Sequence, residues 1–380
     1  MKIAPASEKL FNIIIKLTNR CCLACDYCYI ESHQSKYEAG TVSLDIIKKA
    51  LKDYLFLVKM ERGADLKGQT IKLTWHGGEP LLAGISYFKE IVDLEKSVVP
   101  SPYRVVNALT TNAVKINNDW IDFFKKEEFQ IGVSIDGPKH IHDAHRKWKG
   151  GNGSFEDVMK GIQLLKEGDI LFGALSVVTT ESYRNAEEIF RFFLHNNIKN
   201  LNFIPYTTFQ NWLSPEEYTM FCIKFFDLWY ELDDPKFYVR DFANIIARIF
   251  GRESNLCEYT NCFGNYLGLD TNGDIYMCDL LIGNKQFFLG NIKEMSLSEV
   301  IGSPRYIELK QLARTNAPSC GKCKCFLICT GGCMYRRYLG KENLPGKDIY
   351  CSTRIQLIDH IINALNQSYL SQAAKIEICK

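Results

Sequence analysis

The sequence lacks the features of an exported, membrane-spanning or disordered chain. No window reaches the roughly 18 consecutive apolar residues of a membrane-spanning helix, and the first residues carry no basic, apolar and small-residue pattern of a secretory signal. Proline is scarce, with 11 among 380 residues, whereas 46% of residues are hydrophobic and 24% are charged. This composition excludes disordered, collagen-like and coiled-coil proteins. We therefore expect a cytoplasmic protein with an ordinary core and no membrane partner.

The chain also lacks an excess of charge of either sign. Lys and Arg number 46 against 44 Asp and Glu, which leaves a formal net charge of +2. Binding to a phosphate backbone or to an anionic membrane surface generally depends on a one-sided positive charge. We expect no nucleic-acid partner.

Short runs of β-forming apolar residues alternate with amphipathic segments in the first half of the chain. This alternation is typical of repeated βα units around a parallel sheet, an α/β fold. Right-handed crossovers would curve the sheet into a partial (β/α)6 barrel of the TIM type. The predicted strands are 12–17, 71–75, 105–110, 130–135, 172–178 and 200–204, and the predicted helices are 45–58, 85–96, 119–126, 155–166 and 186–194. Ser154 with Asp157 is predicted to cap the fourth of these helices.

The pattern changes after the sixth strand. Ser214, Pro215 and Glu217 have the spacing of a helix start, with a cap, a proline at the first position and a glutamate three residues after the cap. Beyond residue 254, cysteines become frequent and Gly and Asn interrupt short segments, until a terminal amphipathic stretch. We predict a barrel at 1–210, a helical connector at 211–254, a small cysteine-rich domain at 255–352 and a C-terminal helix at 353–380.

Fifteen cysteines are many for a chain in a reducing compartment, where structural disulfides are rare, so thiolate ligands to metal become the leading explanation. Cys21, Cys25 and Cys28 form C-x3-C-x2-C directly after the first predicted strand. A 4Fe-4S cluster held by three cysteines leaves one iron open to a small molecule with an amine and a carboxylate. A zinc knuckle and three unrelated buried thiols are the alternatives that the spacing leaves open.

The residues around this loop carry a resemblance to a known family. The run LTNRCCLACDYCY at 17–29, with Tyr27 just before the third cysteine, resembles the signature of the radical S-adenosylmethionine (AdoMet) superfamily. In that family one electron from the cluster cleaves AdoMet and releases a 5′-deoxyadenosyl radical. The resemblance implies an oxidoreductase with AdoMet as cofactor, and it implies that Tyr27 lies beside the adenine.

Further motifs agree with this resemblance. Gly77, Gly78 and Glu79 follow the second predicted strand and look like the family's GGEP motif, in which the glycines allow a close backbone approach and the glutamate holds the methionine amine. The resemblance assigns Ser134 to the ribose or methionine part of AdoMet, and Arg146 to its carboxylate. Asn112 follows the third strand and is a further expected AdoMet contact. Relatives continue with Gly at the next position, where this chain has Ala113.

Eight further cysteines lie in the predicted small domain. They include a G-x4-C pattern at 273–278 and a C-x2-C-x5-C-x3-C pattern at 320–333. Two 4Fe-4S clusters with four cysteines each would use all eight and would stabilise a domain with little core, whereas zinc ribbons remain the alternative. The pattern is similar to the SPASM domain of peptide-modifying radical enzymes. That resemblance assigns to an inner auxiliary cluster Cys257, Cys262, Cys278 and Cys333, and to an outer one Cys320, Cys323, Cys329 and Cys351.

Asp279 directly follows Cys278, at the position where sulfatase-maturating relatives carry an aspartate proposed as a base. A carboxylate beside a cluster and a closed pocket is suited to that catalytic role. The alternative is a turn residue that hydrogen-bonds to nearby backbone.

Together these motifs predict an enzyme that abstracts a hydrogen from a residue of a ribosomally made precursor peptide and gives an oxidised or crosslinked product. Trp75 and His76 precede the GGEP motif as in carbon–carbon crosslinking maturases, whereas many enzymes that form formylglycine from Cys or Ser in sulfatases have Phe-Gln there. Formylglycine formation is therefore the second hypothesis. A zinc-stabilised peptide binder or an iron–sulfur electron carrier is the non-enzyme alternative.

The expected partners follow from this chemistry. They are a peptide or protein substrate and a one-electron reductant such as flavodoxin or ferredoxin. Many peptide maturases carry an N-terminal leader-recognition domain, but here the first cluster ligand is already Cys21. A separate leader-binding protein is therefore a further expected partner.

Overall fold

The computed structural model describes residues 12–29, 40–62, 70–208, 212–260, 266–315, 317–340 and 346–378. The chain forms two compact units. The first contains Met1–Ile135, Lys139–Leu175 and Phe263–Arg314, and the second contains Asp136–Pro138, Ser176–Cys262 and Thr315–Lys380. Among the described residues, no helix is both long and apolar enough to cross a lipid bilayer.

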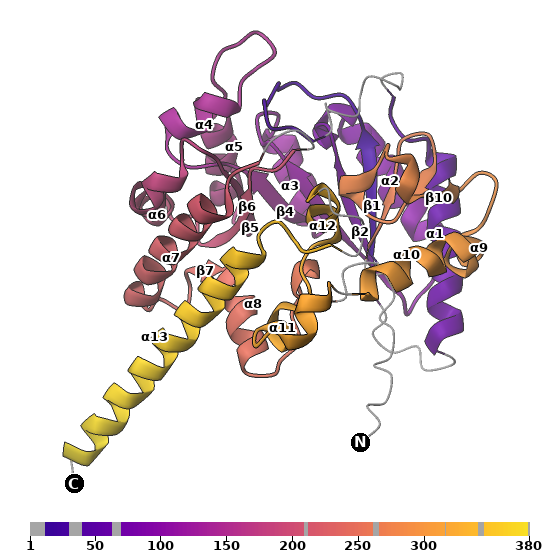
Figure 1. The fold of residues 1–380 in the computed structure, drawn as a ribbon. Helices are drawn as coiled ribbons and strands as arrows, with labels where there is room; N and C mark the ends of the chain where they lie inside the picture. Colours follow the sequence, from indigo (N-terminus) through magenta and orange to yellow (C-terminus); the bar gives the residue numbers. More distant parts are fainter. Residues whose placement is uncertain are drawn as a thin grey trace. The chain divides into compact units, whose positions relative to one another are not determined.

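Parallel strands form the core of the first unit, as the sequence predicts (Figure 1). Each strand pairs with the next along the chain, so that Ile15 lies beside Trp75 and Trp75 beside Leu109. These three side chains are at most 1% exposed, because both faces of a parallel sheet are covered. The strands are β1 (Asn12–Thr18), β2 (Thr70–Gly77), β3 (Arg104–Thr111), β4 (Gln130–Ser134) and β5 (Phe172–Val178), the last of which continues into the second unit.

Amphipathic helices follow these strands. Phe88 on α2 packs edge-to-face against Trp120 and Phe123 on α3, with ring centroids 5.2 and 6.2 Å away. The side chain of Asn117 caps α3 by accepting a hydrogen bond from the Trp120 N–H. The helices of this part are α1 (Leu44–Arg62), α2 (Ile85–Val98), α3 (Asn118–Lys126), α4 (Lys139–His145) and α5 (Phe155–Glu167).

The prediction that Ser154 and Asp157 cap α5 is wrong. The Ser154 hydroxyl donates to the Arg146 carbonyl at 2.7 Å and lies 3.0 Å from His142 Nε2, so it does not bond to the first turn. Asp143 takes that role, because its Oδ1 accepts a 2.8 Å hydrogen bond from the Phe155 N–H. Ser154 therefore fixes the backbone at Arg146, a predicted AdoMet contact.

The cysteine-rich stretch adds strands to the same sheet. β8 (Tyr266–Leu269) pairs in parallel with β1, and β9 (Asp274–Tyr276) and β10 (Phe288–Asn291) extend the edge in antiparallel fashion. The order in the first unit is therefore β10-β9-β8-β1-β2-β3-β4-β5. The short helices α9 (Leu297–Gly302) and α10 (Pro304–Arg314) follow. The predicted segment 255–352 is thus shared between the two units, and the domain boundaries at 210, 254 and 352 stay predictions.

The second unit is mostly helical. The strands β6 (Asn200–Pro205) and β7 (Tyr238–Val239) pair in parallel there. The predicted helix start at Ser214 is confirmed, because Ser214 and Glu217 form a complete capping box at α7. Phe221, Phe225 and Phe226 of α7 are fully buried. The helices are α6 (Ala186–His195), α7 (Pro215–Leu232), α8 (Arg240–Ile249), α11 (Phe326–Cys329), α12 (Met334–Leu339) and α13 (Cys351–Ile378).

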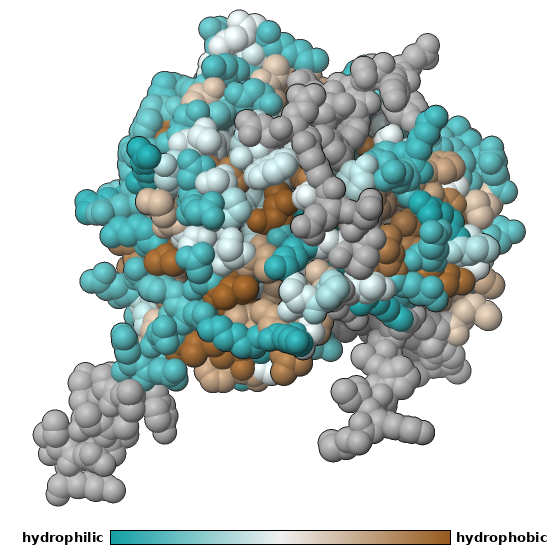
Figure 2. Space-filling view, viewed as in Figure 1, coloured by the Kyte–Doolittle hydropathy of each residue, from teal (hydrophilic) through white to brown (hydrophobic). Residues whose placement is uncertain are grey.

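Hydrophilic residues cover most of the face drawn in Figure 2, and hydrophobic residues appear there in small separate areas. Among the described residues, individual apolar side chains such as Leu171 and Leu327 are strongly exposed. Isolated exposed apolar residues are normal on protein surfaces.

Candidate active site and cluster-binding loops

The loop that follows β1 carries the first three predicted cluster ligands, Cys21, Cys25 and Cys28. Backbone hydrogen bonds fix this loop to another segment of the first unit, since the Ala24 N–H donates to the Lys147 carbonyl at 2.8 Å. Within the loop the Cys28 N–H donates to the Cys25 carbonyl at 3.1 Å. Three thiols are therefore presented by one held segment, which fits a cluster with three protein ligands.

The GGEP loop packs directly against the start of this cysteine loop. The Gly78 N–H donates to the Thr18 carbonyl at 2.7 Å, and the Glu79 N–H donates to the Arg20 carbonyl at 2.8 Å. A Cβ on Gly77 would lie 2.4 Å from the Thr18 oxygen, and a Cβ on Gly78 would lie 2.1 Å from the Arg20 oxygen. Gly77 also has a φ of +131°. Both glycines are required for contact between two backbones, which is a role that the motif alone did not indicate.

Glu79 is fully buried beside the ends of β2 and β3. Its Oε1 accepts hydrogen bonds from Thr111 Oγ1 at 2.7 Å and from the Leu81 N–H at 3.0 Å, while Oε2 accepts one from the Asn112 N–H at 2.7 Å. Burial raises the pKa of Glu79 to about 7, although these hydrogen bonds oppose the shift. A carboxylate oxygen can accept two hydrogen bonds, so Oε2 can also take an ammonium group, which would favour the charged form.

Asn112 points toward the cysteine loop. Its Nδ2 lies 3.5 Å from the sulfur of Cys22 and 3.8 Å from that of Cys21. Cys22, which the sequence left without a role, thus shares a polar contact with a predicted ligand. The following residue, Ala113, has a φ of +63°, which explains why relatives have glycine there.

Tyr27 and Arg146 meet in the first unit. Arg146 Nη1 donates to the Tyr27 hydroxyl at 3.0 Å, and the guanidinium lies 6.0 Å from the centre of the tyrosine ring. Both side chains are buried. Ser134, the third residue of this predicted set, is the last residue of β4 and is half-buried opposite Leu175. The structure thus brings Tyr27 and Arg146 together, and it leaves Ser134 at the carboxyl end of its strand.

Asp279 lies among side chains from distant parts of the sequence. The Tyr29 hydroxyl donates to Asp279 Oδ2 at 3.4 Å and lies 3.1 Å from His76 Nδ1. The Cys278 thiol lies 3.5 Å from Asp279 Oδ1. A Cβ on Gly268 would lie 2.9 Å from the Asp279 Cα, so β8 packs closely against this residue. The carboxylate of Asp279 therefore contacts side chains, in contrast to the turn-residue alternative.

Lys16 completes this group, and sequence reasoning missed it. It lies on β1 and is only 4% exposed. Burial lowers the pKa of Lys16, while the neighbouring Asp270, Asp279 and Cys28 oppose that shift. The signal available in the sequence was a single lysine inside the apolar run IIIKL at 13–17, where a buried strand predicts none.

His76 was noted only as a family marker, and Tyr29 only as part of the signature. In the structure the two rings stack, with centroids 6.1 Å apart and an interplanar angle of 23°. Burial lowers the pKa of His76 and raises that of Tyr29 well above its usual value. Both side chains are therefore neutral near pH 7, so they act as hydrogen-bonding neighbours of Asp279.

The second unit holds the four cysteines assigned to the outer auxiliary cluster. The Cys323 N–H donates to the Cys320 carbonyl at 3.1 Å, which places both thiols on one turn. Burial raises the pKa of Cys320 and of Cys351, and in each case the thiol of Cys329 adds to the shift. Cys320, Cys329 and Cys351 are therefore electrostatic neighbours, which fits one cluster.

The cysteines assigned to the inner cluster are divided. Cys257 and Cys333 are in the second unit, Cys278 is in the first, and Cys262 lies outside the described residues. No three His, Cys, Asp or Glu side chains within the described ranges converge closely enough for a single metal ion. The assignment of all eleven ligands stays a prediction.

Two family models match the chain. Residues 15–193 match the Radical SAM superfamily, and residues 257–324 match SPASM, an iron–sulfur cluster-binding domain. The chain is 26% identical to a serine-type anaerobic sulfatase-maturating enzyme of Bacteroides thetaiotaomicron, over 99% of this chain and 96% of the relative. It is 27% identical to a cysteine-type anaerobic sulfatase-maturating enzyme of Clostridium perfringens, over 93% and 98%. It is also 30% identical to an uncharacterized protein of Methanocaldococcus jannaschii, over 74% and 89%.

Solved structures resemble the fold. The AdoMet-bound structure of anSMEcpe superposes with a TM-score of 0.83 at 26% identity, over 94% of this chain and 99% of that one. Streptococcus suis SuiB bound to AdoMet gives 0.63 at 17% identity, over 90% and 77%, which is a likeness of fold. These matches confirm the predicted α/β fold, the enzyme class and the dependence on AdoMet and 4Fe-4S clusters. The chain therefore belongs to the radical SAM superfamily and carries a C-terminal SPASM domain.

Proposed function

We propose that this enzyme oxidises a seryl or cysteinyl side chain of a peptide or protein to the aldehyde of formylglycine. The observation that carries this proposal is the environment of Asp279, whose two carboxylate oxygens face Tyr29 and Cys278. Similarity over nearly the full length to both serine-type and cysteine-type sulfatase-maturating enzymes supports the same substrate class. It reverses the order that Trp75 and His76 suggested.

We assign the cofactor sites as the sequence predicts. Cys21, Cys25 and Cys28 would hold the first cluster, and the AdoMet contacts would be Tyr27, Gly77, Gly78, Glu79, Asn112, Ser134 and Arg146. When bound, AdoMet and the reduced cluster supply a 5′-deoxyadenosyl radical that removes one hydrogen atom from the substrate β-carbon, and an auxiliary cluster can accept one electron. An aldehyde or thioaldehyde then requires the loss of one further proton, from the hydroxyl or thiol.

Asp279 is the group that would accept this proton. Tyr29 fixes the direction of one carboxylate oxygen, and His76 holds Tyr29 from the other side. Lys16 is a buried cation beside Asp279, and a nearby opposite charge favours the ionised carboxylate that a base requires. A residue that must accept a proton during catalysis is thus held in position by neutral neighbours and one cation.

Anaerobic turnover with matched peptides tests the proposal. The reconstituted enzyme, AdoMet and a strong reductant are incubated with sulfatase-motif peptides that carry Ser, Cys or Ala at the target position. We expect the mass of the aldehyde product and reaction with a hydrazide probe for Ser or Cys, and neither for Ala. Formation of 5′-deoxyadenosine in step with substrate loss, but without any aldehyde, would contradict formylglycine formation.

The second candidate is crosslinking or dehydrogenation of a ribosomally made peptide. The observation that favours it is Trp75-His76, because His76 contacts Tyr29 at the point where sulfatase maturases often have glutamine. Co-expression with the small open reading frame beside the gene distinguishes the two. Loss of two hydrogens from that peptide without an aldehyde would favour this candidate, and a separate leader-binding protein would then be sought. Either reaction needs a one-electron reductant such as flavodoxin or ferredoxin.

A further inference from the structure

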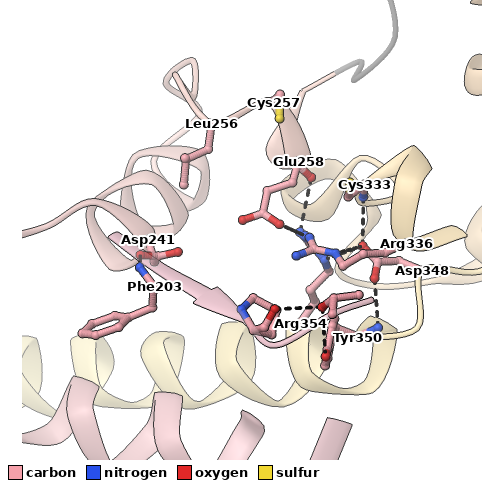
Figure 3. Close-up of polar contacts among 12 residues, drawn as sticks. Phe203, Asp241, Leu256, Cys257, Glu258, Cys333, Arg336, Asp348, Tyr350 and Arg354 are labelled. Atoms are coloured by element: carbon pink, nitrogen blue, oxygen red, sulfur yellow. Dashed lines mark hydrogen bonds and ion pairs between the residues drawn. The ribbon is translucent and has the colours of Figure 1, made fainter. Parts of the chain in front are cut away.

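Four charged side chains form a buried network in the second unit (Figure 3). Arg336 Nε donates to Asp348 Oδ2 at 3.2 Å, and Arg336 Nη2 also bonds to Glu258. Arg354 Nη2 donates to Glu258 Oε2 at 2.5 Å, and its Nε lies 3.4 Å from Asp348 Oδ2. The side chains of Asp348 and Arg354 are only 2% and 5% exposed. Burying four charges has a large desolvation cost, so such a network is weak support for stability by itself.

Asp348 holds two cysteines that the SPASM resemblance assigns to different clusters. Its Oδ2 accepts a 2.9 Å hydrogen bond from the Cys333 N–H, and its backbone carbonyl accepts one of 2.9 Å from the Cys351 N–H. Gly332 has a φ of +81°, and a Cβ there would lie 2.4 Å from Asp348 Oδ2. Side chain and main chain of one residue therefore fix a ligand of the inner cluster and a ligand of the outer cluster.

Arg354 is the cation in the network that faces thiols of both sets. Burial opposes its charged form, but Tyr259, Asp348, Cys329 and Cys333 together raise the pKa of Arg354. The guanidinium carbon lies 4.5 Å from the centre of the Tyr259 ring, which the structure also places against the network. Cys329 belongs to the predicted outer set and Cys333 to the inner one, so this positive charge is shared between the two sites.

A small cavity beside the network does not account for it. The cavity has a volume of about 30 Å³ and is lined by Glu258, Arg336 and Arg354 among other residues of the second unit. This space admits a water molecule and excludes an organic ligand. A substrate site is therefore not the reason for the buried charges.

We propose that the network of Glu258, Arg336, Asp348 and Arg354 is an electrostatic bridge between the two auxiliary clusters. Arg354 raises the reduction potentials of both, and Asp348 lowers them while it fixes Cys333 and Cys351. A cluster with four thiolates is anionic, and adding an electron makes it more so, hence a fixed cation favours reduction and a fixed anion opposes it. This inference rests on the cluster assignment in the proposed function, where an auxiliary cluster accepts an electron from the substrate.

Charge-changing variants at Arg354 and Asp348 test the bridge. The full chain, with Cys21, Cys25 and Cys28 replaced by Ala so that the remaining signals come from the auxiliary clusters, is reconstituted anaerobically and titrated with dithionite under electron paramagnetic resonance. We expect Arg354→Gln to lower both potentials and Asp348→Asn to raise them. The expected change is on the order of tenfold in the equilibrium constant for reduction, which is about 59 mV for a one-electron couple. Arg191→Gln, an exposed residue paired with Glu187 on α6, is the matched control and leaves them unchanged.

The signs separate an electrostatic role from a structural one. Loss of a purely structural contact would move the potentials of both variants in the same direction or leave them unchanged, and either result, at unchanged iron content, overturns the proposal. If Arg354→Gln fails to retain iron, Arg354→Lys keeps the charge and must keep the potentials, while Arg336→Gln must lower them. Iron and sulfide content of the parent chain is measured first. A parent without auxiliary iron refutes the cluster assignment, and the bridge with it, before any potential is compared.

Discussion

Glu79 accepts a 2.7 Å hydrogen bond from the backbone N–H of Asn112, and this bond ties the end of β2 to the residue that follows β3. Both residues lie beside the cysteine loop, because the Glu79 N–H bonds to Arg20 and the Asn112 side chain faces Cys21 and Cys22. One buried carboxylate thus organises the backbone around the predicted AdoMet site and is also the expected partner of the AdoMet ammonium.

Replacing Glu79 separates these two roles. Glu79→Gln keeps the shape and most acceptors, but it removes the charge that an ammonium would meet. Hydrogen bonds to charged groups contribute roughly 1.5–3 kcal/mol, so we expect AdoMet affinity to fall about tenfold to a hundredfold. Equilibrium dialysis of the reconstituted enzyme under anaerobic conditions measures this. Glu90→Gln on the exposed face of α2 is the matched control, and equal affinity in the two variants would contradict the assignment.

A methyl group at Gly78 tests the contact between the GGEP loop and the cysteine loop. The added Cβ would lie 2.1 Å from the Arg20 carbonyl oxygen, so one of the two backbones must move. We expect Gly78→Ala to lose the iron of the first cluster while the auxiliary iron is retained. Gly150→Ala is the matched control, because nothing lies within 4 Å of a Cβ there. Iron analysis of both variants decides, and full iron in Gly78→Ala would show that the loops tolerate separation.

Much of this arrangement could be predicted from the sequence, because it depends on local patterns. The strand β1 reads as a short apolar run, and C-x3-C-x2-C and GGEP each lie within a few residues of a strand end. The pairing of Asn12 with Tyr266 could not be predicted, since it joins residues 254 positions apart and no periodicity encodes such a partner. The meeting of Tyr29 and Asp279 depends on that pairing, because β8 and β9 bring Asp279 to the edge beside β1.

Loss of the Asp279 carboxylate should stop product formation while radical generation continues. Asp279→Asn cannot accept the substrate proton, and general-base groups contribute about 10²- to 10⁴-fold. We expect aldehyde formation to fall by at least about a hundredfold, with AdoMet cleavage largely retained. Tyr29→Phe removes the hydrogen bond that orients Oδ2, and a smaller loss is expected. Asp122→Asn on the exposed face of α3 is the control. A proportional loss of 5′-deoxyadenosine and aldehyde in Asp279→Asn would instead indicate a defect in AdoMet cleavage.

A pH-dependent stability term is expected from Glu95, away from the predicted cofactor sites. Glu95 on α2 is 4% exposed, and its Oε2 accepts a 2.8 Å hydrogen bond from Asn107, which in turn accepts one from Trp75. Its Oε1 has no hydrogen-bond partner among the described residues. Burial raises the pKa of Glu95 to about 7 from its ordinary value of 4.5, although the bond from Asn107 opposes the shift.

The sign of the effect follows from proton binding in the two states. Between about pH 4.5 and pH 7 the unfolded chain has released the Glu95 proton and the folded chain has retained it, so the free energy of unfolding falls as the pH rises through this window. The loss amounts to at most about 3 kcal/mol at neutral pH. Glu95→Gln cannot ionise and keeps an oxygen for Asn107, so its thermal midpoint should rise relative to the parent chain as the pH rises across the window. Thermal unfolding of the two reconstituted proteins across that range, with Glu90→Gln as control, measures this, and midpoints that change in parallel would show that Glu95 is ionised in the folded chain.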